Sequence, residues 1–230
     1  CNNAGVMALE DKATIDGFDV QMQTNHLSHF LLTRELFPLV EAAAAATGDA
    51  RIVNHSSIAR MNPGKKLYPK YFEPRGGDLG GNGNTIQNMA FTGPRWLRYN
   101  QSKLANCAFT AALHHRLQAK GSPVRALVAH PGFSKTNLQN RTKEAGGMSS
   151  FIDDMTGFVY QSAEDGTMGI LSCMCLPDAR SGTFYGPGSG KAANKGRAKP
   201  FDLEPFYDNE DVRELLWQKS EEAIGQPFVI

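Results

Sequence analysis

The chain has 230 residues, of which 41% are hydrophobic and 20% are charged, and its formal net charge is +1. This length and apolar content suffice for one domain with a sizeable core, and the charge gives no electrostatic reason to expect nucleic acid or an acidic membrane as a partner. No stretch reaches the length of a membrane span, because the most apolar region, Phe30 to Ala46, is interrupted by three charged residues.

Helices and strands are predicted to alternate along the chain. The first helix is predicted from about Gly17 to Ala46, bent or broken near Pro38. The later elements are a strand at Arg51 to His55, a helix through Tyr99 to about Ala119 that is ended by Gly121, a strand at Val124 to His130, a helix at Gln161 to Leu176, a strand at Gly182 to Gly186, and a last helix that begins at Asp208 or Asn209 and ends before Gly225. This alternation predicts an α/β fold, and without repeats or linkers residues 1–230 are expected to form a single domain.

Tyr99 and Lys103 are four residues apart on one predicted helix and therefore share a face. A unit charge at roughly 4 Å contributes about 4 kcal/mol at an effective dielectric near 20, which corresponds to about three pKa units. Desolvation opposes this effect, but even a partial lowering of the phenol pKa predicts a tyrosine that exchanges protons near neutral pH. A Tyr-Lys pair at this spacing also arises by chance in most proteins of this size, so the pair needs support from other residues.

Small or polar residues stand where three strand-like segments end. Ser56 and Ser57 follow the strand at Arg51, Pro131-Gly132 follows the strand at Val124, and Asn2-Asn3-Ala4-Gly5 opens the chain after Cys1. Because ligands in open α/β sheets bind beyond the carboxyl ends of the strands, these clusters are predicted to share one rim of the sheet.

Five segments, taken in order, resemble the short-chain dehydrogenase/reductase family and its retinol-dehydrogenase-like branch. They are Asn2 to Gly5, Asn25 to Thr33, Arg51 to Ser57, Tyr99 to Asn106, and His130-Pro131-Gly132 with Thr136. The resemblance covers nearly the whole chain. It implies a Rossmann-type, doubly wound parallel sheet and hydride transfer with a nicotinamide cofactor.

The resemblance also implies four catalytic residues. Tyr99 would protonate the substrate carbonyl oxygen as hydride arrives, and Lys103 would lower the phenol pKa and bond the nicotinamide ribose. Ser57, rather than Ser56, would hold the carbonyl oxygen near the phenol. Asn25 matches the asparagine that positions a water beside the lysine; the alternative is an amide that braces helix backbone.

A second set of residues is implied for the cofactor. Asn3, Ala4 and Gly5 match the segment beside the adenosine ribose, where a missing side chain permits close approach. Pro131, Gly132 and Phe133 would flank the nicotinamide, Thr136 would bond its carboxamide or a phosphate, and Tyr99 and Lys103 would meet the ribose. Without the resemblance, Gly5 and Pro131-Gly132 read as simple turns. The resemblance to the retinol-dehydrogenase-like branch implies NADP rather than NAD as the cofactor.

The chain departs from the family at its start, where no strand and glycine-rich turn for the pyrophosphate precede Asn2. Neither Gly81-Asn82-Gly83 nor Gly186 to Lys191 has the spacing of a substitute. We therefore expect an incomplete Rossmann-type sheet, the C-terminal part of a longer enzyme, that binds NADPH weakly by itself. Its unprotected strand edge would invite pairing with another chain, a homo-oligomer included.

Two function classes remain open. One is an oxidoreductase, NADP-dependent on the branch's pattern, that acts on a bulky apolar ketone, aldehyde or alcohol; the other is a non-catalytic remnant or binding protein that keeps the fold. Two irregular stretches, between Ser57 and Tyr99 and from Phe133 to Gly157, are expected to decide the substrate, the second as a flap or as a plain surface loop. The four cysteines lack both metal-ligand and disulfide spacing, so we expect no metal, reduced thiols and a cytoplasmic protein, unless an organelle signal precedes Cys1.

Overall fold

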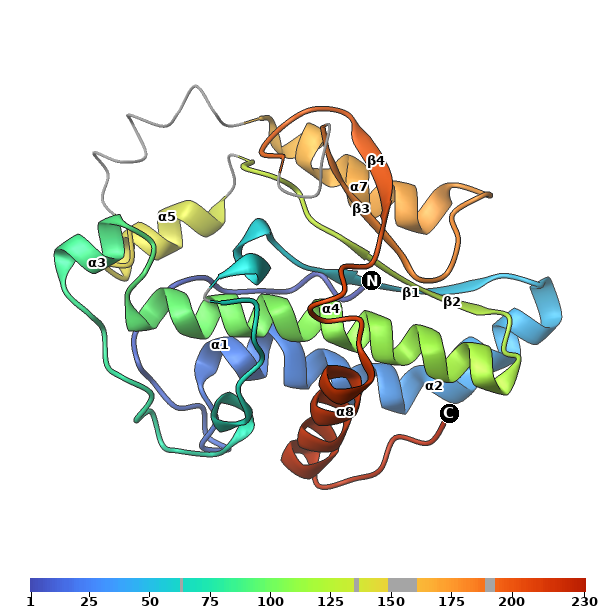
Figure 1. Ribbon diagram of the computed structural model, residues 1–230, viewed down its shortest axis with the longest axis horizontal. Helices are drawn as coiled ribbons and strands as arrows, with labels where there is room; N and C mark the ends of the chain where they lie inside the picture. Colours follow the sequence, from blue (N-terminus) through green and yellow to red (C-terminus); the bar gives the residue numbers. More distant parts are fainter. Residues whose placement is uncertain (63, 135–136, 149–160, 189–192) are drawn as a thin grey trace.

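A mostly parallel sheet of four strands lies between two layers of helices (Figure 1). The computed structural model describes residues 1–62, 64–134, 137–148, 161–188 and 193–230. In sheet order the strands are β1 (Ala50–His55), β2 (Val124–Ala129), β3 (Thr183–Pro187) and β4 (Ala198–Asp202). β1, β2 and β3 are parallel, whereas β4 runs antiparallel to β3. The predicted α/β class is confirmed.

The three predicted strands are confirmed within one or two residues at their ends, and β4 was missed. β4 contains Pro200, which cannot donate a ladder hydrogen bond, and its residues are exposed or only partly buried. An edge strand of this kind carries no apolar run and no clean alternation, so its sequence gives little sign of it. It is held by pairing with β3, where Phe201 faces Phe184.

The long helix α4 (Pro94–Lys120) crosses the middle of the structure under β1 and β2 (Figure 1). Its start follows from Gly93 at the N-cap and Pro94 in the first turn, where the missing N–H costs nothing. Its end follows from Gly121, whose φ of 71° is the left-handed conformation that closes helices. Between these signals nearly every residue from Arg95 to Leu113 is buried, so α4 carries both the core and the polar groups described below.

Helices cover both faces of the sheet, as in a doubly wound arrangement (Figure 1). α2 (Ser28–Thr47), α4 and α8 (Glu210–Ile224) lie on one face, and α7 (Ala163–Cys175) lies on the other. Asn209 caps α8 by accepting a hydrogen bond from the Val212 N–H at 3.1 Å, which is the predicted start of this helix. The predicted helix at Gln161 to Leu176 is likewise confirmed as α7.

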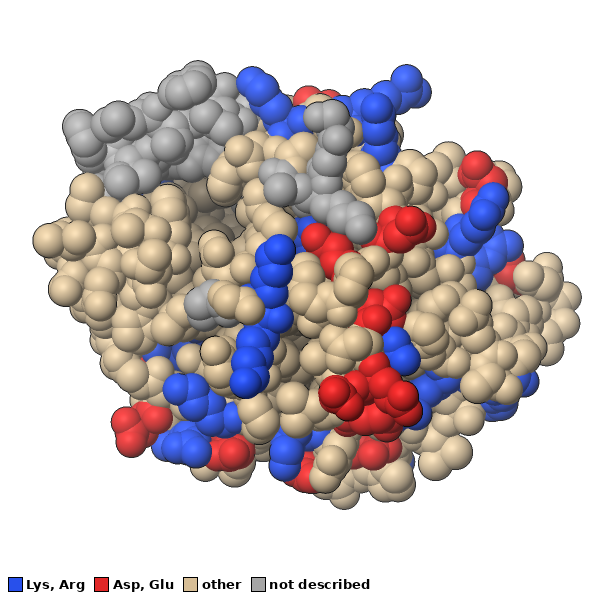
Figure 2. Space-filling model, viewed as in Figure 1, with Lys and Arg blue, Asp and Glu red and all other residues tan. Residues whose placement is uncertain are grey.

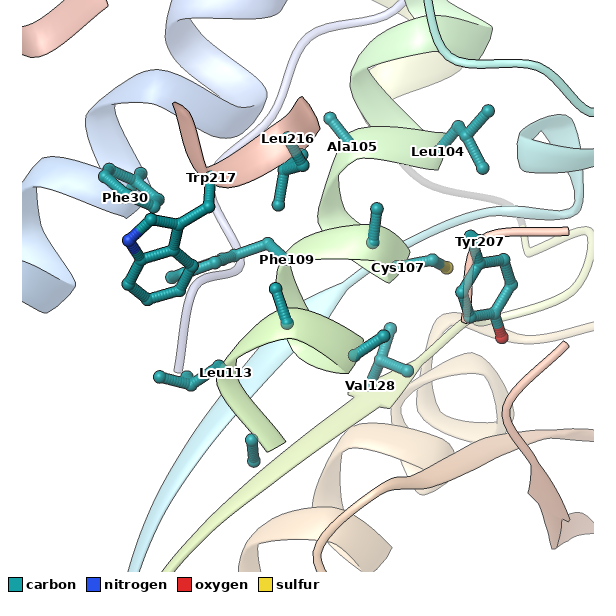
Figure 3. Close-up of a cluster of buried hydrophobic side chains, with 14 of the residues drawn as sticks. Phe30, Leu104, Ala105, Cys107, Phe109, Leu113, Val128, Tyr207, Leu216 and Trp217 are labelled. Atoms are coloured by element: carbon teal, nitrogen blue, oxygen red, sulfur yellow. The ribbon is translucent and has the colours of Figure 1, made fainter. Parts of the chain in front are cut away.

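Aromatic side chains from three helices fill the core beneath the sheet (Figure 3). Phe109 of α4 lies 5.1 Å from Phe30 of α2, and Phe30 lies 5.2 Å from Trp217 of α8, measured between ring centroids. Edge-on and tilted contacts of this kind add to the free energy of burying the rings. Truncation of Phe109 to alanine is expected to cost about 3–5 kcal/mol of folding free energy.

The first helical segment differs from its prediction. It begins as α1 (Val20–Met22), passes through a π-helical turn η1 (Gln23–Leu27) and continues as α2. α2 runs unbroken past Pro38, which is exposed, so water can satisfy the carbonyl that loses its N–H partner there. The irregularity lies at η1 instead, and it places Asn25.

In the described part of the connection between β1 and α4, the helical segments are short. These are η2 (Ile58–Met61), η3 (Pro69–Phe72) and α3 (Thr85–Met89), while α5 (Asn137–Glu144) follows β2. Basic and acidic side chains lie side by side on the face in Figure 2, as expected for a net charge of +1. Among the described residues, no helix is both long and apolar enough to cross a membrane.

Candidate active site

The three predicted clusters lie at neighbouring carboxyl ends of the sheet. The N–H of Asn2 donates to the Val53 carbonyl at 2.8 Å, so the opening segment pairs in parallel beside β1. The N–H of Ser56 donates to the Ala129 carbonyl at 2.8 Å, which joins the end of β1 to the end of β2. The rim predicted from the positions of these polar clusters is therefore present.

A polar stripe on α4 faces the end of β1. Tyr99, Ser102, Lys103 and Asn106 follow the spacing of one helix face, and all four are buried. The Lys103 ammonium donates to the His55 carbonyl at 3.2 Å, and the Asn106 amide donates to the same oxygen at 2.9 Å. One carbonyl thus fixes two side chains of the stripe.

Asn25 reaches this stripe from the π-helical turn η1. Its amide donates to the Ser102 hydroxyl at 2.8 Å and to the Val6 carbonyl at 2.9 Å, and its side-chain oxygen accepts from the Val6 N–H at 2.7 Å. The side chain is completely buried. Asn25 therefore braces the irregular backbone at Val6, not helix backbone as its alternative interpretation held, and it links the opening segment to α4.

Gly5 lies against both Asn25 and Lys103. A Cβ atom at this position would be 3.2 Å from the Asn25 side-chain oxygen and 3.4 Å from the Lys103 nitrogen. Asn3 lies nearby, where its side-chain oxygen is 2.7 Å from the ring nitrogen Nδ1 of His55, and Ala4 between them is exposed. A side chain at Gly5 would thus crowd the buried ammonium.

Tyr99 is buried, with 4% of its surface exposed, between Ala8 and Trp96. Burial raises the pKa of its phenol to about 12, and a hydrogen bond with the Ser57 side chain offsets part of this rise. In the chain as folded, desolvation of the phenolate is the larger influence on this pKa, and the lowering expected from Lys103 stays a prediction. The Lys103 nitrogen lies 5.8 Å from the centroid of the Tyr99 ring.

Burial shifts the pKa of Lys103 in the opposite direction to that of Tyr99. Loss of solvent lowers the pKa of its ammonium to about 8, so it remains mostly charged at neutral pH. Ser57 is the N-cap of η2, and its hydroxyl accepts from the Ala59 N–H at 3.2 Å. The structure thus brings Gly5, Asn25, Ser57, Tyr99 and Lys103 together.

The Pro131 segment lies beyond the end of β2. Gly132 has a φ of 68°, and a Cβ atom there would be 2.1 Å from the Asn194 carbonyl oxygen, so only glycine fits. The Phe133 N–H donates to that oxygen at 2.7 Å, and the Phe133 ring is 39% exposed. Thr136, and residues 149–157 of the predicted flap, lie outside the described residues.

Sequence reasoning missed three polar residues of the site. Ser102 joins Asn25 to the Tyr99 carbonyl, to which it donates at 2.8 Å, and Asn106 shares the His55 carbonyl with Lys103. The signal for Ser102 and Asn106 was their helical spacing from Tyr99, since polar residues in a stripe on a central helix need buried partners. His55 gave no such signal, because its carbonyl rather than its ring makes the contact.

Known proteins resemble the chain over almost all of its length. Retinol dehydrogenase 14 of Mus musculus is 33% identical over 226 residues, which are 97% of this chain and 58% of that protein. Retinol dehydrogenase 13 of Mus musculus is 38% identical over 232 residues, covering 97% of this chain and 59% of that protein. The chain thus spans somewhat less than three fifths of the curated relatives that it matches. No family model matches it.

Solved structures share the fold. The crystal structure of an uncharacterised protein from Mycobacterium paratuberculosis superposes with a TM-score of 0.64 at 31% identity, covering 100% of this chain and 67% of that one. The 3-ketoacyl-(acyl-carrier-protein) reductase of Brucella melitensis, solved with NADH, superposes with a TM-score of 0.52 at 19% identity and covers 83% of this chain and 65% of that one, which supports the fold alone. With its parallel sheet and helices on both faces, the chain has a Rossmann-type fold, and it belongs to the short-chain dehydrogenase/reductase family, in the retinol-dehydrogenase-like branch.

Proposed function

We propose that the protein is an oxidoreductase that transfers a hydride between a nicotinamide cofactor, NADP rather than NAD, and a carbonyl or alcohol group of an apolar substrate. The observation that carries the proposal is the Tyr99 phenol, hydrogen-bonded to the Ser57 side chain and lying over the buried ammonium of Lys103. A phenol, a hydroxyl and a cation at one strand end can hold a carbonyl oxygen and supply it with a proton.

The residues around Gly5 fit a nicotinamide cofactor. Lys103 is buried with an ammonium that has three N–H donors, and no side chain at Gly5 crowds it, which suits a bond to a sugar hydroxyl. When bound, the nicotinamide cofactor supplies or accepts the hydride. Asn3, Ala4 and Gly5 would line the adenosine side, Tyr99 and Lys103 the ribose, and Pro131, Gly132, Phe133 and Thr136 the nicotinamide.

The chain's own groups would manage the proton. In carbonyl reduction the Ser57 hydroxyl donates a hydrogen bond to the carbonyl oxygen and orients it, while the Tyr99 hydroxyl donates its proton to the same oxygen as negative charge develops there. A pKa of about 12 keeps Tyr99 protonated at neutral pH, ready for this direction. The Lys103 charge stabilises the phenolate that remains. Asn25 fixes the positions of the Val6 backbone and the Ser102 hydroxyl by hydrogen bonds.

The surroundings of Tyr99 favour an apolar substrate. Trp96 meets the Tyr99 ring edge-on at 5.9 Å between ring centroids, and Phe91 meets Trp96 at 4.7 Å. Ile86, Met89 and Phe91 at α3 are exposed to solvent, and the surface over α3 in Figure 2 is almost free of charge. An uncharged approach to a buried phenol suits a hydrocarbon-rich carbonyl compound.

The proposals for the cofactor, NADP, and for the cellular compartment each rest on one observation. NADP is favoured by the retinol-dehydrogenase-like branch, and a comparison of NADPH with NADH in one assay decides it. Cys107 and Cys173 are buried free thiols, which suit a reducing compartment, so the cytoplasm is the compartment that we propose.

A second candidate is a non-catalytic protein that keeps the fold for binding. The observation that favours it is the burial of Tyr99. With a pKa of about 12 the phenol is almost never deprotonated near neutral pH, so it can rarely accept a proton from an alcohol. The two candidates differ in whether the Tyr99 hydroxyl is needed for turnover.

The test compares two tyrosine-to-phenylalanine variants in the protein expressed from its complete gene. Tyr99→Phe removes the proposed acid and is expected to lower NADPH-dependent reduction of an apolar aldehyde by at least about 100-fold. Tyr71→Phe removes a hydroxyl from another buried tyrosine, 4% exposed, and is expected to keep the parent rate. A Tyr99→Phe variant as active as the parent would exclude Tyr99 as the acid and favour the non-catalytic candidate.

A further inference from the structure

The short turn η2 that carries Ser57 has few hydrogen bonds of its own. Within it the Arg60 N–H donates to the Ser57 carbonyl at 3.2 Å and the Asn62 N–H donates to the Ala59 carbonyl at 3.1 Å. A single 3₁₀ turn with two backbone bonds gains its rigidity mainly from contacts with the rest of the fold. The Ser57 hydroxyl accepts from the Ala59 N–H of this turn at 3.2 Å, so its direction depends on how the whole turn is held against the rest of the protein.

Arg60 is the side chain that ties this turn to the rest of the protein. It is completely buried, and one guanidinium nitrogen, Nη1, donates to the Ser57 carbonyl at 3.1 Å. A second, Nε, donates to the Glu204 carboxylate at 2.6 Å. The guanidinium carbon lies 4.3 Å from the centroid of the Phe184 ring, which supports the planar group from β3.

These partners come from distant parts of the fold. Glu204 lies between β4 and α8 and is itself 8% exposed, while Phe184 is a fully buried residue of β3. The His130 ring also stacks with the Phe184 ring, at 5.3 Å between centroids, and its Nδ1 accepts from the Gly132 N–H at 3.1 Å. Arg60 thus connects the segment after β1 to β3 and to the segment after β4.

We propose that Arg60 is a positioning residue, which holds the Ser57 carbonyl and thereby aims the Ser57 hydroxyl at Tyr99. This role rests on the proposed function of Ser57. Arg60 acts through Ser57 and is not assigned a contact with substrate or cofactor. Glu204 neutralises the charge of Arg60. The buried guanidinium therefore acts by fixing the position of the Ser57 carbonyl.

Arginine is needed here because its donors form a planar fork. Arg60 donates to Ser57 and Glu204 from different nitrogens of one rigid group, whereas a lysine ammonium is a single point that cannot reach both in the same geometry. Arg60→Lys keeps the charge beside Glu204, so it is expected to fold. A displacement of Ser57 by about 1 Å can lower turnover on the order of 100-fold.

The experiment compares Arg60→Lys with Arg51→Lys. Arg51 also pairs with a carboxylate, Asp49 at 2.7 Å, and donates to the Cys173 carbonyl at 3.0 Å, but it lies at the opposite end of β1. The Ala59 amide donates to the Ser57 hydroxyl. Its hydrogen-exchange rate therefore measures the local stability of η2 and does not depend on catalytic activity. Steady-state kinetics with NADPH and an apolar aldehyde are measured on the same variants, expressed from the complete gene.

In Arg60→Lys we expect the Ala59 amide to exchange at least about tenfold faster, with kcat lowered and KM within about twofold of the parent. In Arg51→Lys the Ala59 exchange rate and kcat should match those of the parent. Parent-like exchange and kcat in Arg60→Lys would overturn the positioning role. If the parent shows no turnover, the proposed function fails, and the exchange rate alone still decides whether Arg60 holds Ser57.

Discussion

His26 is predicted to make the fold sensitive to acid. It follows Asn25 in the π-helical turn, is completely buried among Phe30, Phe72 and Phe109, and bonds the Ser220 hydroxyl at 2.8 Å. Burial lowers the pKa of its imidazole from 6.5 to about 3. The native state therefore keeps this ring neutral at pH values at which the unfolded chain binds a proton.

The sign and size follow from proton linkage. Because the pKa in the folded state is lowered, the stability from neutral His26 is present above pH 6.5 and is lost as the pH falls from 6.5 towards 3. Between pH 7 and pH 4.5 this single group is expected to cost about 2–3 kcal/mol of unfolding free energy. That is a large share of the 5–15 kcal/mol typical of a domain.

The assay is urea unfolding of the parent and of His26→Met at pH 7.0 and pH 4.5. The parent should lose about 2–3 kcal/mol more than His26→Met between the two pH values. Asp19 works in the opposite direction, because burial raises the pKa of its carboxyl to about 6 and the folded state gains stability as it takes up that proton. Its contribution is the same in both proteins and cancels in the difference.

Ser220→Ala provides the matched control. It removes the hydrogen-bond partner of His26 but keeps the imidazole, so it should lower stability by about 1 kcal/mol at both pH values and leave the pH dependence as in the parent. Equal losses of stability in the parent and in His26→Met would refute the buried, neutral state of His26.

Two glycine substitutions probe the candidate site. Gly5→Ala would place a methyl group 3.2 Å from the Asn25 side-chain oxygen and 3.4 Å from the Lys103 nitrogen, so KM for NADPH should rise several-fold with little change in kcat; an unchanged KM would argue against cofactor beside Gly5. Gly132→Ala would bring its Cβ to 2.1 Å from the Asn194 carbonyl oxygen at a φ of 68°, so urea unfolding should show a loss of at least about 2 kcal/mol, and parent-like stability would contradict this close approach.

The sequence predicted the elements whose signals are local. The Gly121 end of α4 and the Asn209 cap of α8 are residues that determine helix ends by their own chemistry. β4 and the π-helical turn at Gln23 carried no such signal, because β4 depends on pairing with β3 and the turn depends on Asn25 meeting Val6.

The residues of the candidate site could be predicted from the sequence, but the direction of the Tyr99 pKa shift could not. The spacing of Tyr99 and Lys103 on one helix face was readable, and the structure brings both beside Ser57. The direction of the Tyr99 pKa was not readable, because it depends on how deeply Ala8 and Trp96 bury the ring. Arg60 was equally hidden, since an arginine in a sequence is most often exposed and its carboxylate partner lies 144 residues away.

The most direct test of the proposed hydride transfer follows deuterium from the cofactor. The protein expressed from its complete gene is incubated with NADPH carrying deuterium at C4 of the nicotinamide and with a long-chain apolar aldehyde, and the alcohol formed is examined by mass spectrometry. Deuterium on the carbinol carbon, formed by the parent and lost in Tyr99→Phe, is the expected result. Saturated NADPH binding with no deuterated alcohol in the parent would contradict an oxidoreductase and leave a binding protein.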